Sequence, residues 1–192
     1  MQKLHIQLED NQQIWFTSDL HFGHRNVLRF CDRPFKDEKE MGVGLIENWN
    51  NTVGENDIVF ILGDTFWFND SHSIKKVLSK LKGKTIYMIP GNHDDFDHYY
   101  RVDDPRIILC PDIVVLWLQE YNSTKKYEIW LSQYPMMTGP HRTNRVWQLF
   151  GHIHSNEFKT EGVDQDLPLH WNQHDVGCDY WGYRPVSFET LK

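Results

Sequence analysis

Cysteine is scarce in this sequence, and the cysteines that are present form no binding pattern. The chain has three, Cys31, Cys110 and Cys178, which lie far apart, and none belongs to a Cys-x-x-Cys pair. An odd number at such spacing argues against a disulfide framework and against a zinc site built from thiolates. We therefore expect reduced thiols and a cytoplasmic location.

Long apolar runs are also missing. No segment approaches the length that crosses a bilayer. Residues 1–10 are mixed and polar, and they lack the apolar region of a secretory signal. We expect a soluble protein that does not act at a membrane.

Positive charge is not in excess. Lys and Arg total 20 and Asp and Glu total 27, which gives a formal net charge of −7. Non-specific binding to nucleic acid depends on neutralising phosphates, so this balance disfavours bulk nucleic acid as a partner and a nuclease with a basic groove. A small substrate that contains phosphate remains compatible, because bound cations can reverse the local charge of a site.

The sequence does contain enough apolar residues for a sizeable core. They make up 40% of 192 residues, and eight of the residues are tryptophan. This length predicts one globular domain over residues 1–192. The tryptophans indicate a well-packed interior or an aromatic-lined pocket.

Polar, metal-competent residues follow three apolar segments in the first half of the chain. The segments 14–18, 57–62 and 85–89 predict strands, and helical patterns separate them. Such alternation predicts parallel βαβ units, whose ligand site lies beyond the carboxyl ends of the strands. The side chains that follow these strands should therefore meet at one edge: Asp19 and His21, then Asp64, then Asn92, His93 and Asp94.

The second half predicts shorter strands with an antiparallel character. They cover 106–110, 113–118 and 127–132. A further short strand covers 147–150, and the segments 172–177 and 183–190 should complete a second sheet. His152 and His154 follow one of these strands at the spacing of two that places side chains on one face. A loop over 136–145 should border the site.

In chain order, the sequence thus offers Asp-x-His, Gly-Asp, Gly-Asn-His-Asp and Gly-His-x-His, each after an apolar run. With these motifs the sequence resembles the calcineurin-like metallophosphoesterases. Residues 18–24, Arg33-Pro34-Phe35 and residues 183–187 are similar to the small phosphoesterases of bacteria and their phages. The resemblance implies an α/β fold in which two mixed β-sheets pack as a sandwich flanked by helices, with four layers in the order α/β/β/α.

The resemblance also implies two divalent metal ions at the strand ends. It assigns Asp19, His21 and His154 to the first ion, Asn92 and His152 to the second, and Asp64 to both. His93 would donate to the substrate phosphate or to its leaving group, and Asp94 would either orient His93 or cap a turn. Two such ions about 3.5–4 Å apart activate water and clamp a displacement at phosphorus. Ligands of this mixed kind suit manganese, with iron, nickel and zinc as alternatives.

One position departs from the family pattern. Where the family has a histidine ligand of the second metal, in a stretch like Ser-His-Tyr-Pro, this sequence has Gln133 between Ser132 and Tyr134. Glutamine offers a neutral amide oxygen, which is a poorer partner for a transition metal than imidazole. Three interpretations stay open: a weakened enzyme, an enzyme with a changed metal preference, and a substitution that traps a bound state.

Three further polar residues lie close in sequence to Asp19 and His21. His24, Asn26 and Arg33 either cap the loop or contact a substrate phosphate, and Arg33 is the best suited of them to a two-pronged contact. The function we expect is hydrolysis of a phosphomonoester or a phosphodiester, with a nucleotide as one candidate substrate. The alternative is a catalytically impaired binding or scaffold protein on the same fold, which Gln133 keeps open.

Overall fold

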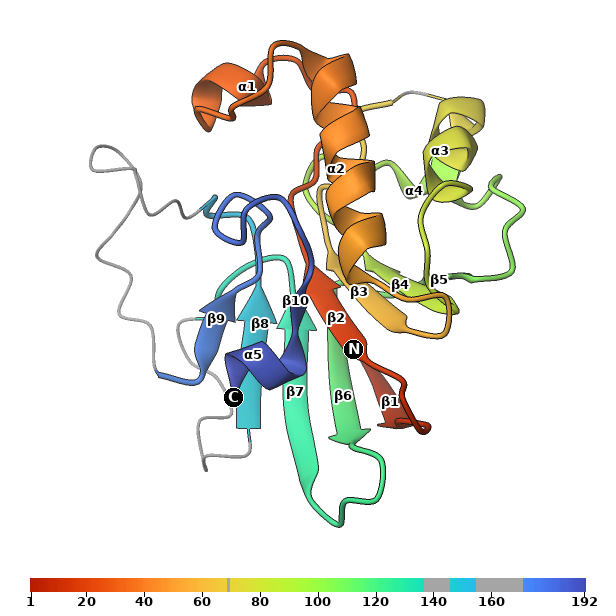
Figure 1. The fold of residues 1–192 in the computed structure, drawn as a ribbon, viewed down its shortest axis with the longest axis vertical. Coiled ribbons are helices and arrows are strands. Elements are labelled where there is room, and N and C mark those ends of the chain that lie inside the picture. The colour runs from red at the N-terminus through yellow and green to blue at the C-terminus, as the bar shows by residue number, and fades with distance from the viewer. Residues whose placement is uncertain (69, 137–145, 155–170) are drawn as a thin grey trace.

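Two five-stranded β-sheets packed face to face form the body of the protein in the computed structural model (Figure 1), which describes residues 1–68, 70–136, 146–154 and 171–192. Sheet A has the strand order β1-β6-β7-β8-β9, and sheet B has the order β10-β2-β3-β4-β5. Each sheet contains both parallel and antiparallel pairs. The predicted sandwich of two mixed sheets with helices is confirmed.

Sheet B carries the βαβ units that the first half of the sequence predicts. Four of its strands are parallel, and they are β2 (Ile14–Thr17), β3 (Ile58–Leu62), β4 (Thr85–Ile89) and β5 (Ile107–Leu109). All five residues of β3 are buried, which explains its unbroken apolar sequence. The connecting helices are α2 (Glu38–Thr52) and α3 (Ser71–Leu78). Asp37 caps α2, because its carboxylate accepts from the Lys39 and Glu40 N–H groups.

Sheet A is built mainly from the second half of the chain. Its strands are β1 (Gln2–Gln7), β6 (Ile113–Gln119), β7 (Lys126–Ser132), β8 (Val146–Phe150) and β9 (Gln173–Asp175). Strands β6 and β7 pair antiparallel, while β8 lies parallel to both β7 and β9. The carboxyl ends of β7, β8 and β9 therefore lie at the same edge of the sheet.

Two hydrophobic clusters hold these layers together. One lies between the sheets and includes Phe16, Phe60 and Leu131. The other lies between sheet B and its helices and includes Trp49 and Ile61. Three helices of four residues complete the described elements: α1 (Val27–Phe30), α4 (Phe96–Tyr99) and α5 (Phe188–Leu191). None of the described helices has both the length and the apolar character needed to cross a membrane.

The structure differs from the sequence-based prediction in three elements. Strand β1 was not predicted, because its residues alternate between half-buried and exposed and so carry few apolar side chains. The segment 183–190, which was expected to complete the second sheet, instead forms β10 (Val186–Ser187). This strand pairs antiparallel with β2 in sheet B and leads into α5. Strand β5 is parallel to β4 and not part of an antiparallel pair. The loop predicted over 136–145 lies, after its first residue, outside the described residues.

Candidate metal centre

The backbone segments that follow β2 and β3 run side by side at the edge of sheet B. The Asp19 N–H donates to the Gly63 carbonyl at 3.0 Å, and the His21 N–H donates to the Asp64 carbonyl at 2.9 Å. Asp19, His21 and Asp64 have φ values of 56°, 52° and 51°. Side chains other than glycine rarely adopt this left-handed backbone, and residues that do so concentrate at functional sites.

Sheet A contributes a second pair with the same backbone feature. His152 and His154, which follow β8, have φ values of 71° and 47°. The His152 N–H donates to Oδ2 of Asp19 at 2.8 Å, which joins the end of β8 to the end of β2. Gly151 permits this approach, because a Cβ there would lie 1.9 Å from Ser18 Oγ and 2.4 Å from Asp19 Oδ2.

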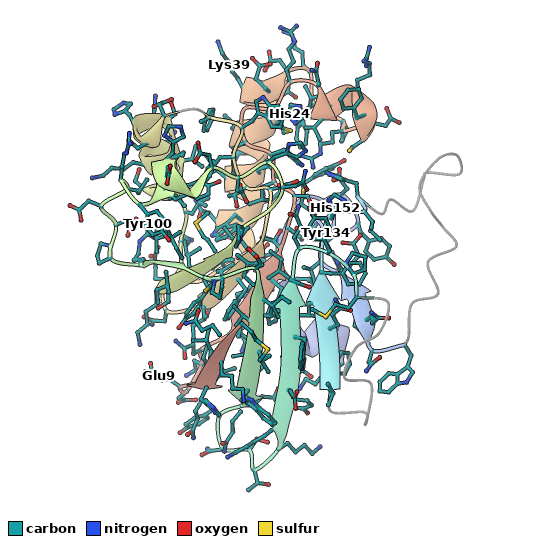
Figure 2. The ribbon with its side chains drawn as sticks, turned by 180° about the vertical axis from the view of Figure 1, so that it is seen from behind. Glu9, His24, Lys39, Tyr100, Tyr134 and His152 are labelled. Carbon is teal, nitrogen blue, oxygen red and sulfur yellow. The ribbon has the colours of Figure 1, made fainter. Side chains whose placement is uncertain are left out.

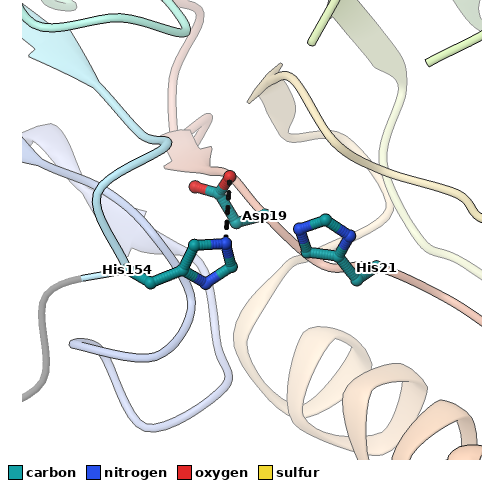
Figure 3. Close-up of side chains that lie close together, drawn as sticks. All are labelled: Asp19, His21 and His154. Carbon is teal, nitrogen blue, oxygen red and sulfur yellow. Dashed lines mark ion pairs between the residues drawn. The ribbon is translucent and has the colours of Figure 1, made fainter. Parts of the chain in front are cut away.

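Three predicted ligands converge on one point. The ligand atoms of Asp19, His21 and His154 lie within 4.8 Å of one another, with the two imidazoles flanking the carboxylate (Figure 3). Oδ1 of Asp19 and Nε2 of His21 are buried, and neither has a hydrogen-bond partner in the described part of the chain. Buried polar atoms are normally paired, so two unpaired ones at one point indicate a place for a cation.

The electrostatics of these side chains agree with that interpretation. Burial raises the pKa of Asp19 to about 7, because nothing nearby fully compensates the carboxylate. Burial, together with the neighbouring His154, lowers the pKa of His21 to about 2. His21 is therefore a neutral imidazole with a free lone pair. A divalent ion would supply the positive charge that the buried Asp19 carboxylate lacks beside it. The residues present fit a metal ion at this position.

Asp179 orients the third ligand. Nδ1 of His154 donates to Asp179 Oδ2 at 2.8 Å, which leaves Nε2 directed toward Oδ1 of Asp19 at 3.9 Å. Burial alone would lower the pKa of His154, but Asp179, Cys31 and Asp19 outweigh it and raise this pKa to about 10. Burial would raise the pKa of Asp179, but His154 and Arg33 hold it at about 2. Such carboxylate–histidine pairs commonly fix a metal-binding imidazole.

Asp179 is not among the site residues predicted from the sequence. This residue follows β9, which lies parallel to β8, so it reaches the same edge as His152 and His154. The sequence feature that could have identified Asp179 is its position just beyond the predicted strand at 172–177. That signal was weak, because no histidine or second acidic residue stands at the spacing of two that marked the other strand ends.

Arg33 lies beneath the centre and not on its surface. Its side chain is fully buried, and it donates to both oxygens of Asp179 at 2.8 Å. It also donates to the carbonyl oxygens of Asp19 at 2.7 Å and Leu20 at 3.0 Å. These contacts favour a role in holding the ligand-bearing loop, in place of the predicted contact with substrate phosphate.

The two other predicted substrate contacts differ in exposure. His24 is buried, its Nδ1 lies 3.4 Å from Nδ1 of His21, and its ring stacks on Trp67 with a centroid separation of 3.8 Å. It therefore supports the face of His21 that points away from the metal position. Asn26 is exposed just before α1, and its side chain makes no capping hydrogen bond there.

The residues expected at a second metal position lie beside the first. Asp64 is buried, its Oδ2 lies 3.7 Å from Nε2 of His21, and its Oδ1 accepts from the His93 N–H at 2.9 Å. His152 is exposed and packs edge-on against Tyr134, with 4.5 Å between ring centroids (Figure 2). Asn92 is exposed, and its backbone N–H donates to Oε1 of Gln133 at 2.7 Å.

His93 and Asp94 occupy the turn after β4. The exposed His93 ring lies 5.7 Å from the His21 ring and 4.9 Å from the Trp67 ring, measured between centroids. The Asp94 carboxylate accepts from the Gly91 N–H at 2.9 Å, from the Thr65 N–H at 3.0 Å and from the Tyr99 hydroxyl. These contacts are those of a turn cap, the second of the two roles that the sequence left open for Asp94.

A cavity of about 270 Å³ opens beside this turn. Its walls are mainly aromatic and include Trp67, whose side chain is 44% exposed. Its lining residues are Phe66, Trp67, Phe68, Asn92, His93, Asp95 and Tyr99. A planar group attached to a phosphate at the metal position would reach this cavity past His93.

Comparison with known proteins agrees with this geometry. Residues 13–187 match the family model described as calcineurin-like phosphoesterase. The chain is 41% identical over 185 residues to an uncharacterized protein of Methanocaldococcus jannaschii, with 94% of this chain and 89% of that protein covered. It is 27% identical over 199 residues to the gene 66 protein of Mycobacterium phage L5, with 92% and 91% covered.

Two further similarities are more limited in what they show. A probable cyclic nucleotide phosphodiesterase of Coxiella burnetii is 29% identical over 116 residues, with 56% of this chain and 42% of that protein covered. The crystal structure of a protein of unknown function from Aquifex aeolicus has a TM-score of 0.67 at 22% identity, with 94% and 98% covered. That structural similarity shows the shared fold.

Proposed function

The chain belongs to the calcineurin-like phosphoesterase family, and from this premise we propose that it hydrolyses phosphate esters at a metal centre built on Asp19, His21 and His154. Family membership supports a metal-dependent hydrolase of phosphoester bonds. The observation that carries the proposal is the pair of buried, unpartnered ligand atoms on Asp19 and His21, to which His154 adds a third.

Each residue around the centre has a distinct task in the proposed reaction. A divalent ion held by Asp19, His21 and His154 would activate a water and offset the charge of the phosphate. Asp179 holds the His154 imidazole in the orientation that binds the ion. Asp64 holds the turn that carries His93 through the His93 N–H, and its Oδ2, 3.7 Å from Nε2 of His21, would be a further ligand of the ion. The exposed His93 imidazole donates a proton to the oxygen of the leaving group.

The donor set narrows the identity of the metal without fixing it. Carboxylate and imidazole ligands suit manganese, iron, nickel or zinc. Cys31 approaches His154 at Nδ1, at 3.3 Å, and so lies on the far side of the imidazole from the ligand atom Nε2. Manganese is the ion that we propose to test first.

The aromatic cavity supports a substrate with a planar group. Base–aromatic stacking stabilises binding by about 1–3 kcal/mol and tolerates different bases. Trp67 is exposed next to His93, where a nucleoside part of a phosphodiester would lie. The name of the Coxiella relative, a probable cyclic nucleotide phosphodiesterase, agrees with this substrate class. We therefore propose a nucleotide phosphodiester as the first natural substrate to test.

A binding protein on the same fold is the second candidate function. Gln133, which stands where the family has a metal-binding histidine, is the feature that favours it. This candidate predicts that a metal ion binds and that no ester is hydrolysed.

Hydrolysis assays separate these candidates. With Mn²⁺ added, we expect turnover of p-nitrophenyl phosphodiesters, and we expect Asp64→Asn to abolish it. His93→Ala should cost about 10²–10⁴-fold with a poor leaving group such as a nucleoside, and much less with p-nitrophenolate, which leaves without a proton. Exposed Asp112→Asn serves as the control. Full activity in Asp64→Asn, or an equal loss with both leaving groups in His93→Ala, would contradict the mechanism.

A further inference from the structure

Gln133 is the first residue after β7, and its side chain is only 2% exposed. It packs where two ligand-bearing loops cross. A Cβ on Gly91 would lie 2.7 Å from Oε1 of Gln133 and 2.1 Å from Oδ1 of Asp64. A Cβ on Gly63 would lie 2.8 Å from the amide carbon of Gln133. The amide is therefore enclosed by the loops that carry Asp64 and Asn92.

The orientation of this amide is set by one hydrogen bond. The Asn92 N–H can only donate, and it donates to Oε1 of Gln133 at 2.7 Å. Turning the amide over would place its NH₂ group against that N–H, so that two donors would face each other. Oε1 must therefore face Asn92, and Nε2 is left on the other side of the amide.

Nε2 of Gln133 has no acceptor in the described part of the chain, although it is buried. A buried donor without a partner is unfavourable, so this atom is poised for an acceptor that enters the site. An NH₂ group has no lone pair to offer a cation and presents positive partial charge to its surroundings. The position that should complete a second metal site thus presents a donor.

The other groups at that position do not make up for the missing ligand atom of Gln133. Oδ1 of Asp64 already accepts from the His93 N–H, Oδ2 of Asp64 lies 3.7 Å from Nε2 of His21 at the first position, and the exposed His152 packs on Tyr134. By contrast, the first position has two unpartnered ligand atoms, one of them on a carboxylate. The residues fit a metal ion at the first position, and they do not fit a second ion beside Gln133.

We infer that this centre binds one metal ion, and that Nε2 of Gln133 donates a hydrogen bond to an anionic oxygen held beside that ion. The phosphate of the ester supplies this acceptor oxygen in the proposed function, so this part of the inference rests on that function. In this centre a fixed amide donor replaces the second cation as the group that stabilises negative charge.

Metal counting tests the first part on the intact protein. The chain is stripped with a chelator, loaded with excess Mn²⁺ and passed through a desalting column. Bound manganese is then measured by elemental mass spectrometry, and the electron paramagnetic resonance spectrum is recorded. We expect one ion per chain with the spectrum of a magnetically isolated ion. Two ions per chain, or a spectrum of coupled ions, would overturn the inference.

Two substitutions test whether Gln133 sets this number. Gln133→Glu has the same shape and still accepts from the Asn92 N–H, but it replaces the donor with a second acceptor oxygen. Gln133→His introduces the imidazole that the family has here. Both variants should bind two ions per chain, and Gln133→His carries the test alone if the buried carboxylate prevents folding. A count that stays at one in the folded variants contradicts the role given to Gln133.

Binding of inorganic phosphate tests the donor. In calorimetry on the manganese-loaded protein, Gln133→Leu should weaken phosphate binding about 10- to 100-fold while one ion stays bound, as for loss of a charge-assisted hydrogen bond. Gln7→Leu, on the exposed edge of β1, is the matched control. Unchanged phosphate affinity in Gln133→Leu overturns the donor role.

These measurements need no turnover, so they are separable from the proposed function. A protein that hydrolyses esters and binds two ions contradicts this inference alone. A protein that binds one ion and hydrolyses no ester contradicts the proposed function alone.

Discussion

Asp179 and His154 are joined by a hydrogen bond of 2.8 Å between Oδ2 and Nδ1, and this bond decides which imidazole nitrogen faces Asp19. Arg33 holds the same carboxylate from behind with two further hydrogen bonds. The three side chains form a buried chain of contacts that ends at the metal position. Asp179 and Arg33 can each be changed without altering a metal ligand.

Replacing Asp179 should weaken metal binding without removing a ligand. In Asp179→Asn, the amide can no longer hold His154 through a charged acceptor, and loss of such a partner commonly costs 10–100-fold in metal affinity, so we expect about that loss. Titration calorimetry with Mn²⁺ measures it, with the exposed Asp112→Asn as control. Equal affinities for the two variants would show that Asp179 does not orient the ligand.

Replacing Arg33 should lower stability more than it changes substrate binding. Arg33→Met leaves the buried Asp179 carboxylate without its guanidinium, and breaking such a pair typically costs about 3–5 kcal/mol. Urea unfolding at pH 7 gives this value. A substrate contact predicts the opposite pattern, in which KM rises and the free energy of unfolding is unchanged.

Adding one methyl group at Gly151 should disturb the join between the sheets. In Gly151→Ala the new Cβ would overlap Ser18 and Asp19, and overpacking of this kind costs about 1–3 kcal/mol. Metal affinity should fall together with the free energy of unfolding. The matched change Gly42→Ala, in the middle of α2, meets only the Phe22 ring at 3.8 Å and should stabilise the protein by about 0.4–1 kcal/mol.

Stability at low pH should depend on an ion pair far from the centre. Arg106 donates to Asp104 and to the Leu81 and Leu78 carbonyls at the end of α3, and its side chain lowers the pKa of Asp104 from 3.8. A lowered folded-state pKa adds stability above the unfolded value, and this stability is lost as pH falls through the folded value.

The stability difference between the wild type and Arg106→Met should therefore be full above about pH 5 and should shrink as pH falls below 3.8. Urea unfolding at pH 7, 5 and 3 measures this trend. If the difference in free energy of unfolding stays constant over this range, Arg106 stabilises the protein through its carbonyl contacts and not through Asp104.

Trp67 should contribute to the choice of substrate. Trp67→Leu removes the exposed indole beside His93, and we expect kcat/KM for a nucleoside phosphodiester to fall about tenfold, the effect of one lost base–aromatic stack. A phosphodiester with only small alkyl groups should be unaffected. Trp117→Leu, whose indole stacks on His5 in sheet A, is the control. An equal loss for both substrates would contradict a stacking role.

The predicted ligands could be found from sequence because each follows a strand whose pattern is strong. Buried parallel strands such as β3 read as unbroken apolar runs, so the residue that follows them is marked. Asp19 and His21 lie beyond the end of β2 with a left-handed backbone, so their convergence comes from this turn and not from the alternation of a strand. Most residues proposed for the first metal position can therefore be predicted from local sequence.

Other features depend on contacts between distant segments, which no local pattern encodes. Strand β1 is an edge strand with one half-buried face, so its sequence looks polar. Val186 pairs with Phe16 in sheet B, and the sequence around Val186 does not indicate this partner. The orientation of the Gln133 amide depends on the Asn92 N–H, a group that every residue other than proline possesses.

The proposed ligands Asp19 and His154 follow strands of different sheets and lie far apart in the chain. Closing so long a loop is entropically costly, and contacts of this range form slowly in folding. An ion that needs both ligands can be captured only after the two sheets have docked. Uptake of metal during refolding therefore marks the time at which docking is complete, and a chelator added earlier should leave strand formation untouched.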